Sequence, residues 1–155
     1  MLVQLKKEEF DHYIDFAYQI SLDLSKSCYP SYADGIKTKE DFVRIAKESL
    51  YKRNYEIYLF YYENQLEGWI NFYYLPEDKY LACETFSVVN HQEIALEEFM
   101  KYLKTKFTGY EFYFGCSTLN QEAMGYLTRN DFNKIEESQV CLFNFKEYSI
   151  RFKSK

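Results

Sequence analysis

The chain has 155 residues and a formal net charge of −5 at pH 7, with 19 Lys and Arg against 24 Asp and Glu. This length is typical of one domain, so we expect a single domain over residues 1–155. A negative surface is poorly suited to the phosphates of nucleic acid or to an anionic membrane. We therefore expect neither as a partner.

The four cysteines are widely spaced and include no C-x-x-C pair, at positions Cys28, Cys83, Cys116 and Cys141. This pattern favours reduced thiols over a disulfide framework or a zinc site, and we expect no metal. The first ten residues, MLVQLKKEEF, contain charges and no signal-peptide core. No apolar run reaches the length of a membrane span. The expectation is a soluble cytoplasmic protein.

The first third of the chain predicts a strand and two helices. MLVQL is a short strand candidate, and apolar residues then recur at helical spacing over residues 8–24. Residues 25–37, SKSCYPSYADGIK, contain Pro, Gly and Ser and indicate a loop. Thr38 followed by Asp41 resembles a capping box, which predicts that a second helix begins there.

Three strands follow as a meander, at residues 56–62, 67–75 and 80–88. The segment ENQL between the first two has the length of a hairpin turn. Apolar residues at helical spacing predict a helix over residues 92–107. YEFYFGCS, residues 110–117, predicts a further strand.

A short helix and two strands complete the predicted order. Thr118 and Gln121 have the spacing of a second capping box. Asn130 suits the left-handed residue that closes such a helix. The last strand candidates are residues 133–137 and 139–146.

The complete order is β-α-α-β-β-β-α-β-α-β-β. An antiparallel meander followed by a strand–helix–strand crossover predicts an α/β (α+β) fold. We expect a mixed, mostly antiparallel seven-stranded sheet with about four helices on its two faces. Ligands of such sheets favour the crevice where neighbouring strands change direction. That places the expected site at the carboxyl ends of the strands finishing near Val88 and Cys116.

Three segments, LEGWINFYYL, ETFSVV and NQEAMGYLTRNDF, together with this element order, resemble the GNAT N-acetyltransferase superfamily over nearly the whole chain. Gly68 matches the glycine that commonly begins the third strand of that family. The Glu of ETFSVV, Glu84, matches an acidic residue near the end of its fourth strand. Asn120, Ala123 and Phe132 match its N-x-x-A signature and the aromatic residue that follows.

The resemblance implies transfer of an acetyl group from acetyl-CoA to an amine of a small molecule or peptide, without a metal. It implies that the backbone of Phe86, Ser87 and Val88 bonds to the pantetheine arm, as an added strand would. It also implies that Asn120 orders the turn between strand and helix beside the cofactor.

The loop that should hold the cofactor pyrophosphate departs from the family pattern. VVNHQEI contains neither glycine nor Lys or Arg. Asn90 is predicted to cap the helix, with Glu93 closing the capping box and repelling a second anion. The nearest downstream cation, Lys101, lies about 16 Å further along the helix axis. His91 either orients the ligand or is simply an exposed loop residue. We expect weak or absent acetyl-CoA binding at this degenerate loop.

Glu84 is the candidate general base, because an ordinary amine must lose a proton before it attacks a thioester. Strand alternation would place it on one face with Phe86 and Val88. The alternatives are a carboxylate that only orients substrate, one that faces solvent, or a charge on an edge strand.

The proton donor for the leaving thiolate is less evident. The family often supplies a Tyr at the position of Leu127, and Tyr126 stands beside it. Tyr126 is therefore either the acid or a packing residue.

The loop over residues 25–37 corresponds in order to the variable acceptor-binding segment of the family. Tyr29, Tyr32 and Asp34 would suit a cationic amine through cation–π and charge contacts, or they belong to an ordinary Tyr-rich loop. Three readings follow: an N-acyltransferase that uses CoA, a catalytically inactive GNAT-fold binding or regulatory module, and a transferase that uses a carrier without nucleotide charges. The aromatic strand VCLFNF predicts a possible homodimer.

Overall fold

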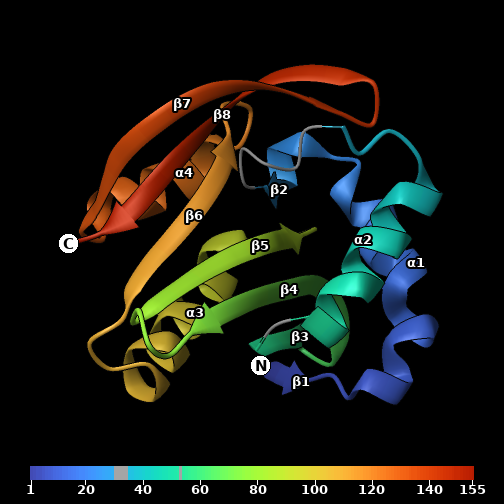
Figure 1. Cartoon of the computed structure of the whole chain (residues 1–155), viewed down its shortest axis with the longest axis horizontal. Coiled ribbons are helices and arrows are strands. Elements are labelled where there is room, and N and C mark those ends of the chain that lie inside the picture. Colours follow the sequence, from blue (N-terminus) through green and yellow to red (C-terminus); the bar gives the residue numbers. More distant parts are fainter. Residues whose placement is uncertain (30–34, 53) are drawn as a thin grey trace.

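The computed structural model describes residues 1–29, 35–52 and 54–155 (Figure 1). The helices are α1 (Phe10–Ser21), α2 (Lys39–Lys52), α3 (Gln92–Lys106) and α4 (Gln121–Arg129), with short 3₁₀ turns η1 (Lys7–Glu9) and η2 (Leu24–Lys26). The strands are β1 (Leu2–Gln4), β2 (Ser27–Cys28), β3 (Asn54–Tyr62), β4 (Gln65–Leu75), β5 (Tyr80–Val88), β6 (Glu111–Ser117), β7 (Phe132–Leu142) and β8 (Phe145–Ser154). In these ranges no helix is both long and apolar enough to cross a membrane.

One mixed sheet organises the molecule, with the strand order β1-β3-β4-β5-β6-β8-β7 and β2 paired with β5. Strands β3, β4 and β5 form the predicted antiparallel meander, and α3 connects β5 to its parallel neighbour β6. The predicted mostly antiparallel α/β fold with four helices is confirmed. The sheet has eight strands in the described residues, not the predicted seven. The additional strand, β2, has two residues and is too short to leave a periodic pattern in the sequence.

Helices cover both faces of the sheet (Figure 1). Helices α3 and α4 pack on one face over a largely aromatic core that includes Phe72, Phe86, Phe99, Phe114 and Leu127. Helices α1 and α2 cover the β3–β4 part of the other face over a second core that includes Phe10, Ile14, Phe42, Leu59 and Trp69. The side chains of Val88 and Cys116, at the strand ends of the expected site, belong to the core under α3 and α4.

Gly68 brings three strands close together. A Cβ atom at this position would lie 2.8 Å from Val88 Cγ2 and 3.1 Å from Phe60 Cβ. Real Cβ atoms essentially never show a contact of 2.8 Å, and 3.1 Å is unusually tight, so a larger residue would displace Val88 and strain the packing of β4 against β3 and β5. The match of Gly68 to the family glycine thus has a direct packing cause.

Two hairpins turn through left-handed residues. The predicted ENQL turn is confirmed, and its first two residues have φ of 48° and 66°, which suits a two-residue hairpin loop. The same geometry recurs at Phe143 and Asn144, with φ of 50° and 66°. The predicted strands 133–137 and 139–146 are therefore wrong in their bounds, because the turn lies inside the second one. Asn144 is a common turn residue, but Phe143 beside it is not, so the pair gives only a weak turn signal in the sequence.

The helix starts show one confirmed cap and one corrected cap. Asp41 N–H donates to Thr38 Oγ1 at 3.1 Å and Thr38 N–H donates to Asp41 Oδ2 at 3.3 Å, as predicted. Helix α4 is capped by Asn120, whose Oδ1 accepts from Ala123 N–H at 3.1 Å, and not by Thr118. Thr118 and Asn120 are both good N-cap residues close to the start of α4, and Asn120 forms the cap.

The end of α4 is also displaced by one residue from the prediction. Asn130 has φ −115° and donates its side-chain N–H to the carbonyl of Tyr126 at 2.8 Å. The left-handed residue is Asp131, with φ 66°. Asp is among the few residues that tolerate this conformation.

Candidate functional site

The candidate site begins where two parallel strands separate. The pairing of β5 with β6 ends at Cys83 and Phe114, although β5 continues to Val88. Beyond that point the edge of β5 turns away from β6, and β2 lies beside both strand ends (Figure 1). The chain order predicted a ligand site at this crevice.

Strand β2 covers the edge of β5 on which the cofactor was expected. It runs antiparallel to β5, with Ser27 opposite Ser87 and Cys28 opposite Phe86. Phe86 and Ser87 are two of the residues whose backbone was predicted to bond to pantetheine. In this structure the groups on that edge are therefore engaged by the chain itself.

A buried chain of hydroxyl groups fixes β2 from the side of α1. Ser87 Oγ lies 3.0 Å from Ser27 Oγ and 3.0 Å from Ser21 Oγ, and all three side chains are inaccessible to solvent. Tyr29 donates its hydroxyl to the carbonyl of Ser21 at 2.7 Å, and burial raises the pKa of this phenol. These contacts attach the residues after α1 firmly to β5.

Asn120 fixes the same strand from the side of α4. Its Nδ2 donates to the carbonyl of Ser27 at 3.0 Å and to Gln92 Oε1 at 2.7 Å. The side chain is fully buried, and its Oδ1 already caps α4. One amide thus connects β2, the first turn of α3 and the start of α4.

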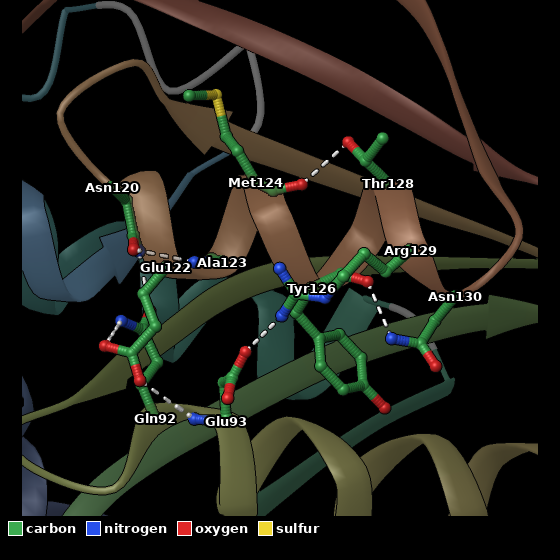
Figure 2. A network of polar contacts seen from close by, with 10 residues as sticks. All are labelled: Gln92, Glu93, Asn120, Glu122, Ala123, Met124, Tyr126, Thr128, Arg129 and Asn130. Atoms are coloured by element: carbon green, nitrogen blue, oxygen red, sulfur yellow. Dashed lines mark hydrogen bonds and ion pairs between the residues drawn. The ribbon is translucent and has the colours of Figure 1, made fainter.

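The N-terminus of α3 differs from the prediction. Its N-cap residue is His91, with φ 61° and no side-chain cap, whereas Asn90 is exposed and does not cap the helix. Glu93 N–H donates to Glu122 Oε1 at 3.3 Å, and Gln92 Nε2 donates to Glu122 Oε2 at 3.3 Å (Figure 2). A carboxylate from α4 therefore lies at the positive end of α3, where a phosphate would otherwise bind.

A cation also lies at this helix start. Arg129 Nη2 forms an ion pair with Glu93 Oε1 across the interface between α3 and α4 (Figure 2). The linear sequence suggested Lys101 as the nearest cation to this helix start, but in the fold Arg129 lies there. Gly125 leaves room for this arginine, because a Cβ at Gly125 would lie 2.9 Å from Arg129 Nη1. Positions 93 and 129 are far apart in sequence, so no local pattern could reveal the pair.

Searches of protein-family models and of curated proteins find no match to this sequence. Solved structures do match. The spermidine N-acetyltransferase of Vibrio cholerae in complex with CoA and spermine has a TM-score of 0.68 at 7% identity, covering 99% of this chain and 93% of that one. The acetyltransferase of Salmonella typhimurium that modifies the N-terminal serine of ribosomal protein L7/L12 has a TM-score of 0.63 at 15% identity, with 98% and 92% covered. The chain has the GNAT fold.

A third neighbour with this fold, the ribosomal-protein-alanine N-acetyltransferase of Brucella melitensis, has a TM-score of 0.64 at 7% identity and covers 99% of this chain. Identities this low establish the GNAT fold alone. The chemistry of this chain has to be argued from its own residues.

Glu84 marks the point where β5 leaves β6. Cys83 and Thr85 face consecutive residues of β4, so Glu84 between them is the extra residue of a β-bulge. The bulge interrupts the strict alternation on which the prediction relied, since Cys83 and Phe86 both belong to the core under α3. Glu84 is half-buried. Burial is the main cause of the raised pKa of the Cys83 thiol, and the charge of Glu84 is the second cause.

Tyr126 is packed between α4 and α3 of the GNAT fold and is 7% exposed. Burial raises the pKa of its phenol, and the carboxylates of Glu97 and Glu93 raise it further. Figure 2 shows the ring directed toward α3. These contacts support the packing interpretation, and the role of acid stays a prediction. Leu127, at the position of the family Tyr, is fully buried.

His91 is held by partners that the sequence did not indicate. Its Nδ1 lies 2.7 Å from Glu67 Oε1, and its ring stacks on Tyr62 with 3.7 Å between centroids. The Glu67 side chain is only 8% exposed. His91 is thus anchored to the ends of β3 and β4, and its left-handed backbone turns the chain into α3.

The expected acceptor loop is described only in part. Tyr32 and Asp34 lie outside the described residues. Tyr29 is buried with its hydroxyl engaged, so it does not form an open wall. It lines a small, mostly apolar hollow of about 10 Å³, together with Leu24, Ser117, Val140, Leu142, Glu147 and Tyr148.

CoA does not fit the conformation described. Its pantetheine arm would need the edge of β5 that β2 occupies, and its diphosphate would need the helix start that Glu122 occupies. Among the described residues, no group of three or more His, Cys, Asp or Glu is arranged to hold a metal ion. An extended ligand on this edge of β5 would have to displace β2, and an anion at the start of α3 would have to displace the Glu122 carboxylate.

Proposed function

We propose that the protein is a GNAT-type N-acyltransferase whose acyl donor, a CoA thioester, binds along β5 after β2 has left that edge. The observation that carries the proposal is the register of β2, which pairs with Phe86 and Ser87. An edge that accepts one extended segment offers the same N–H and C=O groups to another. The donor arm and β2 are then competitors for one edge.

The acceptor in this proposal is an amine of a small molecule or of a peptide. Solved GNAT-fold neighbours include an enzyme named for spermidine and one that modifies an N-terminal serine, which supports both classes. Glu84 would accept or orient the proton of the ammonium group, because it lies at the bulge where the two strands separate. Val88, Asn90, His91 and Asn120 would surround the donor, and Tyr126 remains the candidate acid.

Weak donor affinity is part of the proposal. Glu122 satisfies N–H groups at the start of α3, and Glu93 adds a second carboxylate, which is only partly offset by Arg129. An incoming diphosphate meets repulsion and an occupied helix dipole. We expect a dissociation constant for CoA above roughly 100 µM, or less than about 5.5 kcal/mol of binding free energy.

A second candidate, a GNAT-fold module without catalysis, is favoured by the anchoring of β2. Ser27 is bonded to both Ser87 and Asn120, all three side chains being buried. Each such hydrogen bond contributes about 0.5–1.5 kcal/mol to the closed form. The summed free energy of these hydrogen bonds determines whether β2 leaves the edge of β5 often enough for turnover.

A thiol-release assay tests the proposal. The protein is incubated with acetyl-CoA and a panel of polyamines and short peptides, with calorimetric CoA titration in parallel. We expect release above the buffer rate for at least one amine, reduced at least tenfold in Glu84→Gln and unchanged in Glu77→Gln, an exposed carboxylate in the β4–β5 turn. No CoA binding at millimolar concentration and no release would overturn the proposal in favour of the non-catalytic module.

A further inference from the structure

Strand β2 brings two buried thiols into contact. Cys28 Sγ lies 3.7 Å from Cys116 Sγ, across the gap between β2 and the end of β6. The two side chains are 2% and 0% exposed, and both are free thiols. They are 88 positions apart in sequence, so neither could be assigned a partner from the sequence.

We propose that Cys28 and Cys116 form a redox-sensitive pair whose disulfide locks β2 across the edge of β5. The bond itself follows from the thiol contact. Its effect on donor binding rests on the proposed function, because a locked β2 blocks CoA only if that edge is the donor site.

The surroundings keep the two sulfur atoms together. Asn120 Nδ2 lies 3.6 Å from Cys28 Sγ, and the Cys116 thiol donates to the carbonyl of Asn120 at 3.7 Å. The pairing of Cys28 with Phe86 fixes the backbone on the other side. Since a disulfide joins its sulfur atoms at about 2.05 Å, they need to approach by less than about 2 Å. Side-chain rotation and a small shift of a two-residue strand can supply such an approach.

The other two cysteines have different surroundings. Cys83 Sγ contacts the carbonyls of Asn71 and Thr85 at 3.7 and 3.6 Å within β4 and β5. Cys141 is half-buried on β7, which pairs with β8 and not with β2. They therefore serve as internal controls for thiol chemistry.

The oxidant we consider is a low-molecular-weight disulfide such as oxidised glutathione. When β2 opens, the Cys28 thiolate attacks one glutathione sulfur, and one glutathione thiolate leaves. When β2 returns, the Cys116 thiolate attacks the Cys28 sulfur, the protein disulfide forms and the second glutathione thiolate leaves. The two protons lost by the cysteines pass to these thiolates, so two protein thiols are oxidised and one glutathione disulfide is reduced.

Because the first step needs β2 to open, disulfide formation is slow while β2 is paired with β5. The hydrogen bond with Cys116 and burial raise the pKa of the Cys28 thiol, so the reactive thiolate is scarce while β2 is in place. Opening exposes the thiol and removes both causes. The rate of disulfide formation therefore reports how often β2 leaves β5.

The experiment uses the full chain, incubated with oxidised glutathione and analysed by peptide mass spectrometry without reduction. We expect a cross-link between the peptides of Cys28 and Cys116, and a fall in free thiols from four to two. Cys83→Ala should retain the cross-link, and Cys28→Ala and Cys116→Ala should each lose it. Closing a long loop should raise the melting temperature by more than about 5 °C, reversibly on reduction.

The outcomes separate the two proposals. A cross-linked protein that binds CoA at least tenfold more weakly than the reduced protein supports the lock. Failure of the pair to cross-link, or mixed glutathione adducts spread over all four cysteines, overturns it. A cross-linked protein with undiminished CoA binding also overturns the lock. A cross-link in a protein that binds no CoA in either state supports the thiol pair and contradicts the proposed transferase instead. If Cys28→Ala unfolds, Cys28→Ser provides the same comparison.

Discussion

Replacing Glu122 tests how the start of α3 treats an anion. In Glu122→Ala, the N–H of Glu93 and the side chain of Gln92 lose their carboxylate partner. The loss of a cap costs about 1 kcal/mol, and the loss of a charge at a helix N-terminus costs about 0.3–1 kcal/mol. For a domain of this size we expect the melting temperature to fall by about 3–7 °C.

The same change should strengthen CoA binding. Two unit charges about 4 Å apart repel by about 1 kcal/mol in water and by about 4 kcal/mol at the effective dielectric of a protein surface. Removing even the smaller repulsion raises affinity about fivefold. The freed N–H groups would add to this gain. Arg129 remains available as a phosphate partner when a ligand draws it away from Glu93.

Calorimetric titration with CoA and with pantetheine separates charge from shape. Pantetheine carries no phosphate, so its affinity should be equal in the wild type and Glu122→Ala, whereas the affinity for CoA should rise at least fivefold in the variant. Glu77→Ala makes the same change in net charge at a distant turn and should leave both affinities unchanged. A folded Glu122→Ala protein with unchanged CoA affinity, or an equal gain in Glu77→Ala, would refute the reasoning.

Three further predictions concern stability and pH. Asn120→Ala removes the cap of α4 and leaves the carbonyl of Ser27 and Gln92 Oε1 unsatisfied, so urea unfolding should show that the free energy of unfolding falls by about 2–4 kcal/mol. A fall below about 0.5 kcal/mol would contradict the role of Asn120 in connecting β2, α3 and α4. Gly68→Ala forces a Cβ against Val88 and should lower the free energy of unfolding by about 1–3 kcal/mol in the same assay. In the control Gly109→Ser nothing lies near the new Cβ, so this change should act only through its left-handed backbone and leave the near-ultraviolet circular dichroism of the β4–β5 core unchanged. The folded state raises the pKa of the Cys28 thiol above its ordinary value of 9.0, so the contribution of this thiol to the free energy of unfolding is complete below pH 9 and is lost as pH rises toward the folded pKa. The wild type should therefore lose more stability between pH 8 and pH 10 than Cys28→Ala. Equal losses would show that this thiol is not buried.

The architecture was predictable because each long element carries its own signal. The strand meander and the helices over residues 8–24 and 92–107 have clear periodicity, and their order specifies the crossover between β5 and β6. The exceptions are local. The hairpin turn pairs Asn144, a common turn residue, with Phe143, which is not one, and the left-handed position after α4 is Asp131 instead of Asn130.

The site was less predictable, because its determining contacts join distant segments. The sequence shows that the start of α3 is acidic and has no glycine, through Glu93 and the loop before it, but the expected cap by Asn90 is wrong and weak phosphate binding stays a prediction. Glu122 and Arg129 change the meaning of this acidic helix start, since they come from α4 and meet α3 only in the fold. Likewise, no periodic signal marks Ser27 and Cys28 as a strand, because pairing with β5 is their only regular feature.

Hydrogen exchange at the edge of β5 tests the central claim most directly. The amides of residues 84–90 are followed by mass spectrometry in the free protein and at increasing concentrations of CoA. If β2 covers this edge, residues 27–28 and 84–90 should be protected together in the free protein. At millimolar CoA, residues 27–28 should lose protection while the β5 segment keeps it. Rapid exchange of residues 84–90 without ligand, or tight CoA binding that leaves β2 protected, would contradict the account.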